Sequence, residues 1–141
     1  MPISRVRRGG QARGFATTEI LVAVAVVALV GTLGFLTLGG RDKTLVQSEA
    51  AEIALFLQRA RLRATESGRD VLVTYDAEAR QLTAGPATHP IGSRIDAQAA
   101  PSRIRISPSG ENDGMRVDLQ RKAERVAVTL DWLTGRVEVV R

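Results

Sequence analysis

The pattern of hydrophobic and polar positions divides the chain into three stretches: one that is continuously apolar, one with helical spacing and one in which the two kinds of residue alternate. The first runs from Ile20 to Gly40, which is 21 residues without a charged side chain. A helix of that length spans about 31 Å, close to the hydrocarbon thickness of a bilayer, and it would be apolar on every side. We therefore predict a transmembrane helix over residues 20–40.

The second stretch, residues 42–67, contains no proline or glycine, and its apolar residues recur at steps of mostly three and four. This spacing predicts an amphipathic helix with one buried face. Asp42 is placed to cap or charge its start, and Gly68 suits a left-handed C-cap. We expect one helix from about 16 to 66, bent or interrupted at Gly39-Gly40, with a separate core helix after a linker as the alternative. The expected buried positions are Leu45, Val46, Ala50, Ile53, Ala54, Leu57, Ala60 and Ala64.

After Gly68 the period changes to two, which predicts strands. Asp76 to Ala79 is expected to be a turn, Gly85 to Ser102 a loop, and Gly110, Gly114 and Gly135 turn glycines. Short strands with tight turns indicate an antiparallel sheet whose apolar face is covered by the helix stripe, so the predicted fold class is α+β. The predicted strands are 71–75, 80–84, 103–107, 115–119, 125–130 and 136–140.

The positive charge is concentrated at the start of the chain. The sequence has 20 Lys and Arg against 15 Asp and Glu, a formal net charge of +5. Four arginines and no acid lie in residues 1–14, so the remainder has 16 against 15, or +1. The basicity therefore does not by itself indicate a nucleic-acid partner. There is no cysteine, which excludes disulfides and thiolate metal sites.

Three interpretations of the N-terminal stretch compete. A cleaved secretory signal needs a shorter apolar region and a small-x-small site, and Thr37-Leu38-Gly39 is a weak one. A plain signal anchor places the arginines in the cytoplasm by the positive-inside rule. The third interpretation also explains two further features: the glycine before the apolar stretch, Gly14, and the carboxylate at its edge, Glu19, which is costly near a membrane interior.

The stretch from Arg13 to Val22, which reads RGFATTEILV, resembles the prepilin cleavage motif of type IV pilins and type II secretion pseudopilins. The resemblance implies that a membrane peptidase cuts between Gly14 and Phe15 and methylates the new amine of Phe15. It also implies that Glu19 pairs with the Phe15 amine of a neighbouring subunit in a filament, because an unpaired carboxylate in a dry helix bundle is heavily penalised. Residues 16–18 are more polar than is usual in the family.

A second resemblance covers most of the rest of the chain. Residues 60–71, the turn at 106–110 and the closing segment 134–139 are similar to the H-type minor pseudopilins of type II secretion, a group also similar to a minor pilin of type IV pili. The expected organisation is a leader (1–14), a transmembrane and assembly helix (15–40), an amphipathic helix (41–67) and a periplasmic β-domain (68–141).

The resemblance implies a non-enzymatic filament subunit for protein export, with no cofactor. Its expected partners are other major and minor pseudopilins, the prepilin peptidase and an inner-membrane assembly platform. The expected location is the inner membrane, single-pass, with a cytoplasmic N-terminus and a periplasmic C-terminal domain. The alternatives are a minor type IV pilin acting in pilus assembly or DNA uptake, and an uncleaved anchored periplasmic domain.

Other candidate chemistry is weak. The single histidine, His89, lacks companion ligands for a metal site, and Ser107 and Ser109 read as turn residues rather than nucleophiles. Residues 111–114 carry three side chains with oxygen atoms that could bind calcium, but they lack the alternating spacing of a calcium-binding loop. Asp113-Gly114 instead favours a hairpin turn. Basic residues of the β-domain permit a DNA-backbone patch, but aromatic residues are too few for a stacking platform. These basic residues are Arg103, Arg105, Arg116, Arg121, Lys122, Arg125, Arg136 and Arg141.

Overall fold

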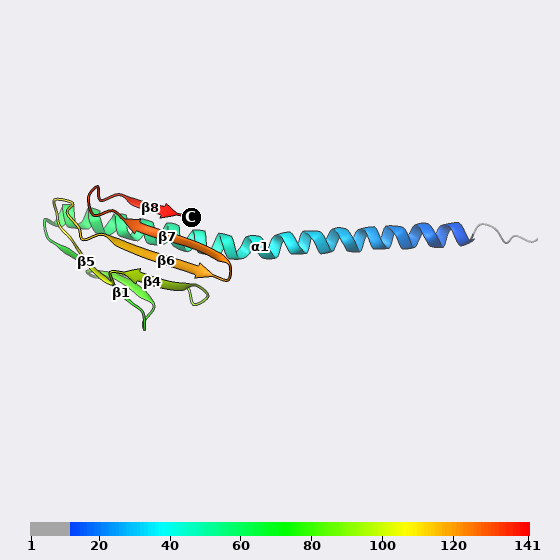
Figure 1. The fold of residues 1–141 in the computed structure, drawn as a ribbon, viewed down its shortest axis with the longest axis horizontal. Helices are drawn as coiled ribbons and strands as arrows, with labels where there is room; N and C mark the ends of the chain where they lie inside the picture. The colour runs from blue at the N-terminus through cyan, green and yellow to red at the C-terminus, as the bar shows by residue number, and fades with distance from the viewer. Residues whose placement is uncertain (1–11) are drawn as a thin grey trace, which may run out of the picture. The chain divides into compact units, whose positions relative to one another are not determined.

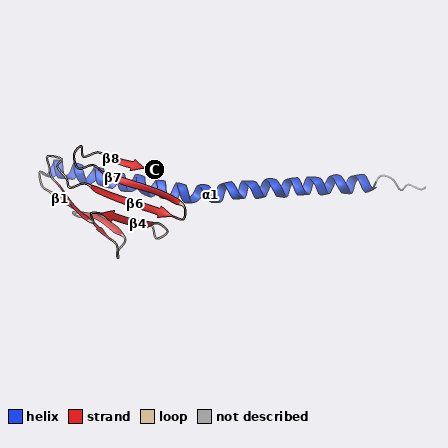
Figure 2. Ribbon diagram, in the orientation of Figure 1, coloured by secondary structure: helices blue, strands red, loops and turns tan. Residues whose placement is uncertain are grey.

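The computed structural model describes the backbone of residues 12–141 and the side chains of residues 16–30 and 40–141. One α-helix, α1 (Ala12–Ser67), is followed by eight strands within this part of the chain. The chain divides into two compact units, Met1–Gly39 and Gly40–Arg141. Figure 1 and Figure 2 show the helix and the strand-rich part that follows it.

The strands form two four-stranded antiparallel sheets. The first has the order β3-β2-β1-β5 and contains β1 (Val71–Asp76), β2 (Gln81–Ala84), β3 (Ala87–Pro90) and β5 (Arg103–Ile106). The second has the order β4-β6-β7-β8 and contains β4 (Asp96–Ala100), β6 (Met115–Arg121), β7 (Glu124–Leu130) and β8 (Val137–Val140). The sequence predicted the antiparallel pairing but only one sheet.

Both sheets share a single core with the second half of α1. Six residues of the predicted stripe are fully or almost fully buried, and Ala54 packs against them, whereas Leu45 is 41% exposed. The strands contribute alternate residues such as Val73, Leu82 and Val117, as the period of two requires. The buried stripe consists of Val46, Ala50, Ile53, Leu57, Ala60 and Ala64.

The end of the helix and the first turn form as predicted. Gly68 has a φ of 63°, the left-handed conformation that ends a helix at little steric cost to glycine. In the turn after β1, the Asp76 carboxylate accepts hydrogen bonds from the backbone N–H groups of Glu78 and Ala79, both at 2.9 Å. Such short-range acceptance by aspartate stabilises turns.

The predicted loop from Gly85 to Ser102 is wrong, because it contains β3 and β4. Strand β3 has a proline at its end and another just before it, and prolines rarely occur inside strands. Strand β4 is rich in alanine and has low intrinsic strand propensity. It exists because five of its residues pair with β6, from Asp96↔Gln120 to Ala100↔Arg116.

The predicted hairpin at Asp113-Gly114 is also wrong. Strands β5 and β6 belong to different sheets, so the segment between them crosses from one sheet to the other. Its residues are held locally: the Asn112 side chain accepts a hydrogen bond from the Gly114 N–H (2.9 Å), and the Asp113 carboxylate accepts one from the Arg105 N–H (2.8 Å). The positive φ of Gly114 serves this crossover.

Asp42 does not begin a helix, since α1 continues through it, and its role differs from the predicted cap. Its carboxylate is almost buried and contacts the Arg121 guanidinium and the Lys122 ammonium, the latter at 2.7 Å, at the turn between β6 and β7. Arg121 also donates to the Arg94 carbonyl at 3.2 Å. Asp42 therefore ties α1 to the second sheet. Hydrogen bonds from Lys122 and Arg121 lower the pKa of its carboxyl.

Replacement of Asp42 by asparagine tests this tie. The pKa of Asp42 is lower in the folded chain than in the unfolded chain. Its ion pairs therefore stabilise the fold fully at pH values above the unfolded-state pKa. This stabilisation is lost as the pH falls through the folded-state pKa. We expect Asp42→Asn to lower the thermal midpoint by a few degrees at neutral pH and to converge with the parent chain in acid. Asp118→Asn, which removes an exposed partner of Arg116, is the control and should change little. A constant gap between Asp42→Asn and the parent at all pH values would contradict this account.

Candidate assembly surfaces

The predicted cleavage and assembly residues all lie within α1. Gly14 and Phe15 are helical, and their side chains lie outside the described residues. Glu19 is described and exposed, one helical turn after Phe15.

The helix after Glu19 exposes large apolar side chains. Eight of them between residues 20 and 30 are between 53% and 72% exposed. Soluble proteins rarely expose contiguous apolar surface of this extent, and such surface marks contact with a partner or a membrane. The eight are Ile20, Leu21, Val22, Val24, Val26, Val27, Leu29 and Val30.

The predicted membrane span of residues 20–40 includes residues 31–39, whose side chains lie outside the described part. Among the described residues, no helix has the length and apolar character needed to cross a membrane.

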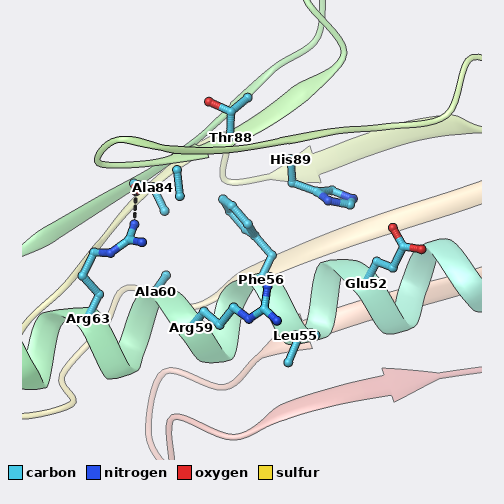
Figure 3. A pocket seen from close by; sticks show the side chains of 10 residues that line it. Glu52, Leu55, Phe56, Arg59, Ala60, Arg63, Ala84, Thr88 and His89 are labelled. Carbon is cyan, nitrogen blue, oxygen red and sulfur yellow. Dashed lines mark hydrogen bonds between the residues drawn. The ribbon is translucent and has the colours of Figure 1, made fainter.

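A groove of about 410 Å³ lies between α1 and the β2–β3 hairpin (Figure 3). Phe56 points from the helix toward β3, and Arg63 donates a hydrogen bond to the Ala84 carbonyl at 3.0 Å. The helical side of the groove therefore combines the apolar Leu55, Phe56 and Ala60 with the charged Glu52, Arg59 and Arg63. The groove is lined by Glu52, Leu55, Phe56, Arg59, Ala60, Arg63, Ala84, Ala87, Thr88 and His89.

The single histidine links the edge strand β3 to the helix. His89 Nε2 lies 3.0 Å from Glu49 Oε1, and the two side chains are only 16% and 13% exposed. The Phe56 ring packs against the imidazole with centroids 5.8 Å apart. His89 was predicted to lie in a loop, and the sequence offered no signal for its pairing with Glu49. The contact explains the histidine as a structural residue of the groove wall.

Ser107 and Ser109, which were considered as nucleophiles in the sequence, form a local turn. Ser107 and Ser109 hydroxyls lie 2.7 Å apart in a turn closed by the Gly110 N–H donating to the Ser107 carbonyl. No cluster of three or more histidine, aspartate or glutamate side chains that could hold a metal ion occurs in residues whose side chains are described.

The basic residues of the β-strands are largely balanced by acids. Of the eight considered for a DNA patch, five lie within 4 Å of a carboxylate: Arg105 with Asp70, Arg116 with Asp118, Arg136 with Glu138, and Arg121 and Lys122 with Asp42. Arg103 and Arg105 share an exposed strand face, as the alternation predicted. This surface is one of mixed charge, in which most of the basic side chains already have a carboxylate partner.

The turn between β7 and β8 presents two large apolar side chains whose exposure was not predicted from the sequence. Trp132 and Leu133 are 66% and 74% exposed. The preceding Asp131 accepts hydrogen bonds from two backbone N–H groups of the turn, those of Leu133 and Thr134. Gly135 was predicted as a turn glycine, and Asp131 four residues before it is a further turn signal that would have placed Trp132 and Leu133 in this turn.

Comparisons with known proteins relate the chain to secretion pseudopilins. No family model matches it. It is similar to the type II secretion system protein H of Xanthomonas campestris pv. campestris, with 30% identity over 144 residues that cover 94% of this chain and 84% of the relative.

Two solved structures share the fold. The type IV minor pilin FimU of Pseudomonas aeruginosa matches with a TM-score of 0.60 and 15% identity over 71% of this chain and 91% of that one. The minor pseudopilin EpsH of the Vibrio cholerae type 2 secretion system matches with a TM-score of 0.57 and 18% identity over 67% of this chain and 95% of that one. These likenesses establish a pilin-like α+β fold, and the identity across nearly the whole length of the chain shows that it belongs to the type II secretion system protein H family of minor pseudopilins.

Proposed function

We propose that the chain is made as a precursor, cut between Gly14 and Phe15, held in the inner membrane by the apolar part of α1, and then assembled with other pseudopilins into the filament that supports protein export. The observation that carries this proposal is the exposed apolar surface of residues 20–30 directly after Glu19. In the isolated chain this surface is in contact with water, which is unfavourable by roughly 25 cal/mol for each square ångström of apolar area. A bilayer or a bundle of like helices removes that cost.

In this proposal the subunit is structural and not an enzyme. Its basic leader lies on the cytoplasmic side and its strand-rich unit in the periplasm, in keeping with the positive-inside rule. The prepilin peptidase and the assembly platform act on it before export begins. The balanced charges of the strand unit favour this role over DNA capture by a minor type IV pilin.

Cleavage is tested by the mass of the N-terminal peptide of the mature protein. We expect it to begin at Phe15, with the added mass of a methyl group if the amine is modified. Gly14→Val should block the cut, because glycine lets a peptidase approach the backbone closely and the added side chain occupies that space. Gly10→Val, a matched change inside the leader, should leave it intact. A mature protein that retains Met1 would rule out the precursor.

Glu19 is proposed to set the axial register of subunits. It lies one turn, about 6 Å, beyond Phe15 along the helix axis. A neighbour shifted by about that distance brings its Phe15 amine level with Glu19, and the two opposite charges neutralise each other in an otherwise apolar bundle. A wrong shift leaves both charges unpaired.

The change Glu19→Ala separates assembly from processing. We expect normal cleavage and membrane retention, but incorporation into sheared filaments reduced by about tenfold or more, because the amine of the neighbour then lacks its partner. Immunoblots of filament and membrane fractions measure both. Glu66→Ala, at an exposed position of the same helix outside the groove, should assemble normally. Normal amounts of the Glu19→Ala chain in filaments would show that the carboxylate does not set the register.

A further inference from the structure

Strand β8 lies at the outer edge of the second sheet and pairs with β7 on one side (Figure 1). The Asp131 N–H donates to the Arg136 carbonyl at 2.9 Å, which identifies Asp131 and Arg136 as a hydrogen-bonded pair of the ladder. Because such pairs alternate, Glu138 and Val140 direct their backbone groups toward β7, and Val137 and Val139 direct theirs outward. Within the described residues, these outward groups face no partner strand.

Two other edges are protected in ways that β8 is not. The Ile91 N–H donates to the Arg80 carbonyl at 2.8 Å, so the outward positions of β3 are the even ones. Prolines occupy positions 86 and 90, and they leave Thr88 as the outward N–H donor between them. On β5, the outward Arg105 N–H is already bonded to the Asp113 carboxylate. Natural sheets commonly block their edges in this manner.

Among the strands and their connections, residues 68–141, the exposed large apolar side chains gather at the β8 edge. Five large apolar side chains of residues 68–141 are substantially exposed. Four of them belong to β8 or the turn before it: Trp132, Leu133, Val139 and Val140. Unpaired strand edge and exposed apolar side chains therefore coincide, and this combination is typical of a surface that pairs with another strand.

The turn holds its apolar side chains in a fixed place. Asp131 Oδ1 accepts hydrogen bonds from the N–H groups of Leu133 (2.8 Å) and Thr134 (2.6 Å) and from the Thr134 hydroxyl (3.0 Å). These bonds also lower the pKa of the Asp131 carboxyl. The Asn112 amide donates to the Asp131 carbonyl at 3.2 Å. A turn ordered in this way loses little conformational entropy when a partner covers it.

We propose that β8 pairs antiparallel with β8 of a second copy of the chain, about a two-fold axis at Val137. Charge selects the register. Pairing about Glu138 would place that carboxylate against its own copy, and pairing about Val139 would make no charge pair. Pairing about Val137 places Arg136 opposite Glu138 twice, and opposite charges across a strand pair are favourable.

The same register covers the exposed turn. Residues 136–138 of the two copies lie opposite each other in this register. Because the two strands run antiparallel, the C-terminal end of each β8 extends toward the turn of the other copy, where Gly135 has a positive φ and the chain leaves the strand. The β4-β6-β7-β8 sheet of one copy and the same sheet of the other copy then form one continuous sheet of eight strands. The apolar side chains at the β8 edge then become part of a contact between chains.

A charge exchange tests the register in the full-length chain. Arg136→Glu and Glu138→Arg should each weaken self-association by about tenfold, because each places like charges opposite one another. The double variant restores opposite pairs and should associate like the parent chain. Arg116→Glu disrupts a comparable exposed pair on the internal strand β6, that of Arg116 with Asp118 (2.9 Å), and should have no effect. Sedimentation of detergent-solubilised protein gives the dissociation constants. A double variant that fails to recover would overturn the proposed pairing.

Cysteine cross-linking separates this contact from association through the apolar helix. The chain has no cysteine of its own. Arg136→Cys chains mixed with Glu138→Cys chains should form disulfides between copies, because opposite residues of a non-hydrogen-bonded pair have Cα atoms about 4.5 Å apart, within disulfide range. Arg116→Cys mixed with Asp118→Cys should not. Equal yields from the two mixtures, or none from the first, would contradict the interface while leaving the proposed filament role untouched.

Discussion

The structure of the strand-rich unit depends on one apolar stripe along the second half of α1. Six side chains from Val46 to Ala64 lie on this stripe, and each is at most 2% exposed. Each sheet must bury its apolar face against another element, and the stripe contributes to the one core that both sheets share. The helix therefore acts as the shared third layer, and Asp42, with Arg121 and Lys122, fixes one end of it to the second sheet. His89 with Glu49 fixes the first sheet to the same helix.

The first half of α1 differs from the second in that its described large apolar side chains are exposed. Its described side chains from Ile20 to Val30 are apolar and exposed. One helix thus combines a segment whose apolar side chains are buried within the fold with a segment whose apolar side chains are exposed. In the proposed role the uncovered segment passes from lipid to a helix bundle, and Glu19 is the polar group that makes one arrangement of that bundle better than others.

The elements that were predictable from the sequence are those whose signal is local. The helical stripe follows from steps of three and four, and the left-handed Gly68 and the Asp76 turn follow from residue chemistry. What could not be predicted arises from long-range pairing. Strand β4 depends on β6, twenty residues away, and its alanines carry no strand signal of their own.

The candidate sites show the same division. Glu19 and Gly14 are recognisable because their motif is continuous in the chain, whereas the groove wall joins Glu49 to His89 across forty residues. Asp42 was predicted as a helix cap because aspartate is common both at helix N-termini and in buried ion pairs, and the sequence alone does not distinguish the two roles. The free edge of β8 could not be predicted from the sequence, because the pairing of β8 with β7 determines which of its N–H groups face outward.

The central claim is that the apolar segment of α1 is covered in the working assembly although it is exposed in the isolated chain. Single cysteines at Val26 and Leu72, which are 53% and 48% exposed, provide a matched comparison in a chain that has no other cysteine. In secreting cells treated with a membrane-impermeant maleimide, we predict labelling of Leu72→Cys and protection of Val26→Cys, with both labelled after denaturation. Equal labelling of the two in intact cells would contradict the claim.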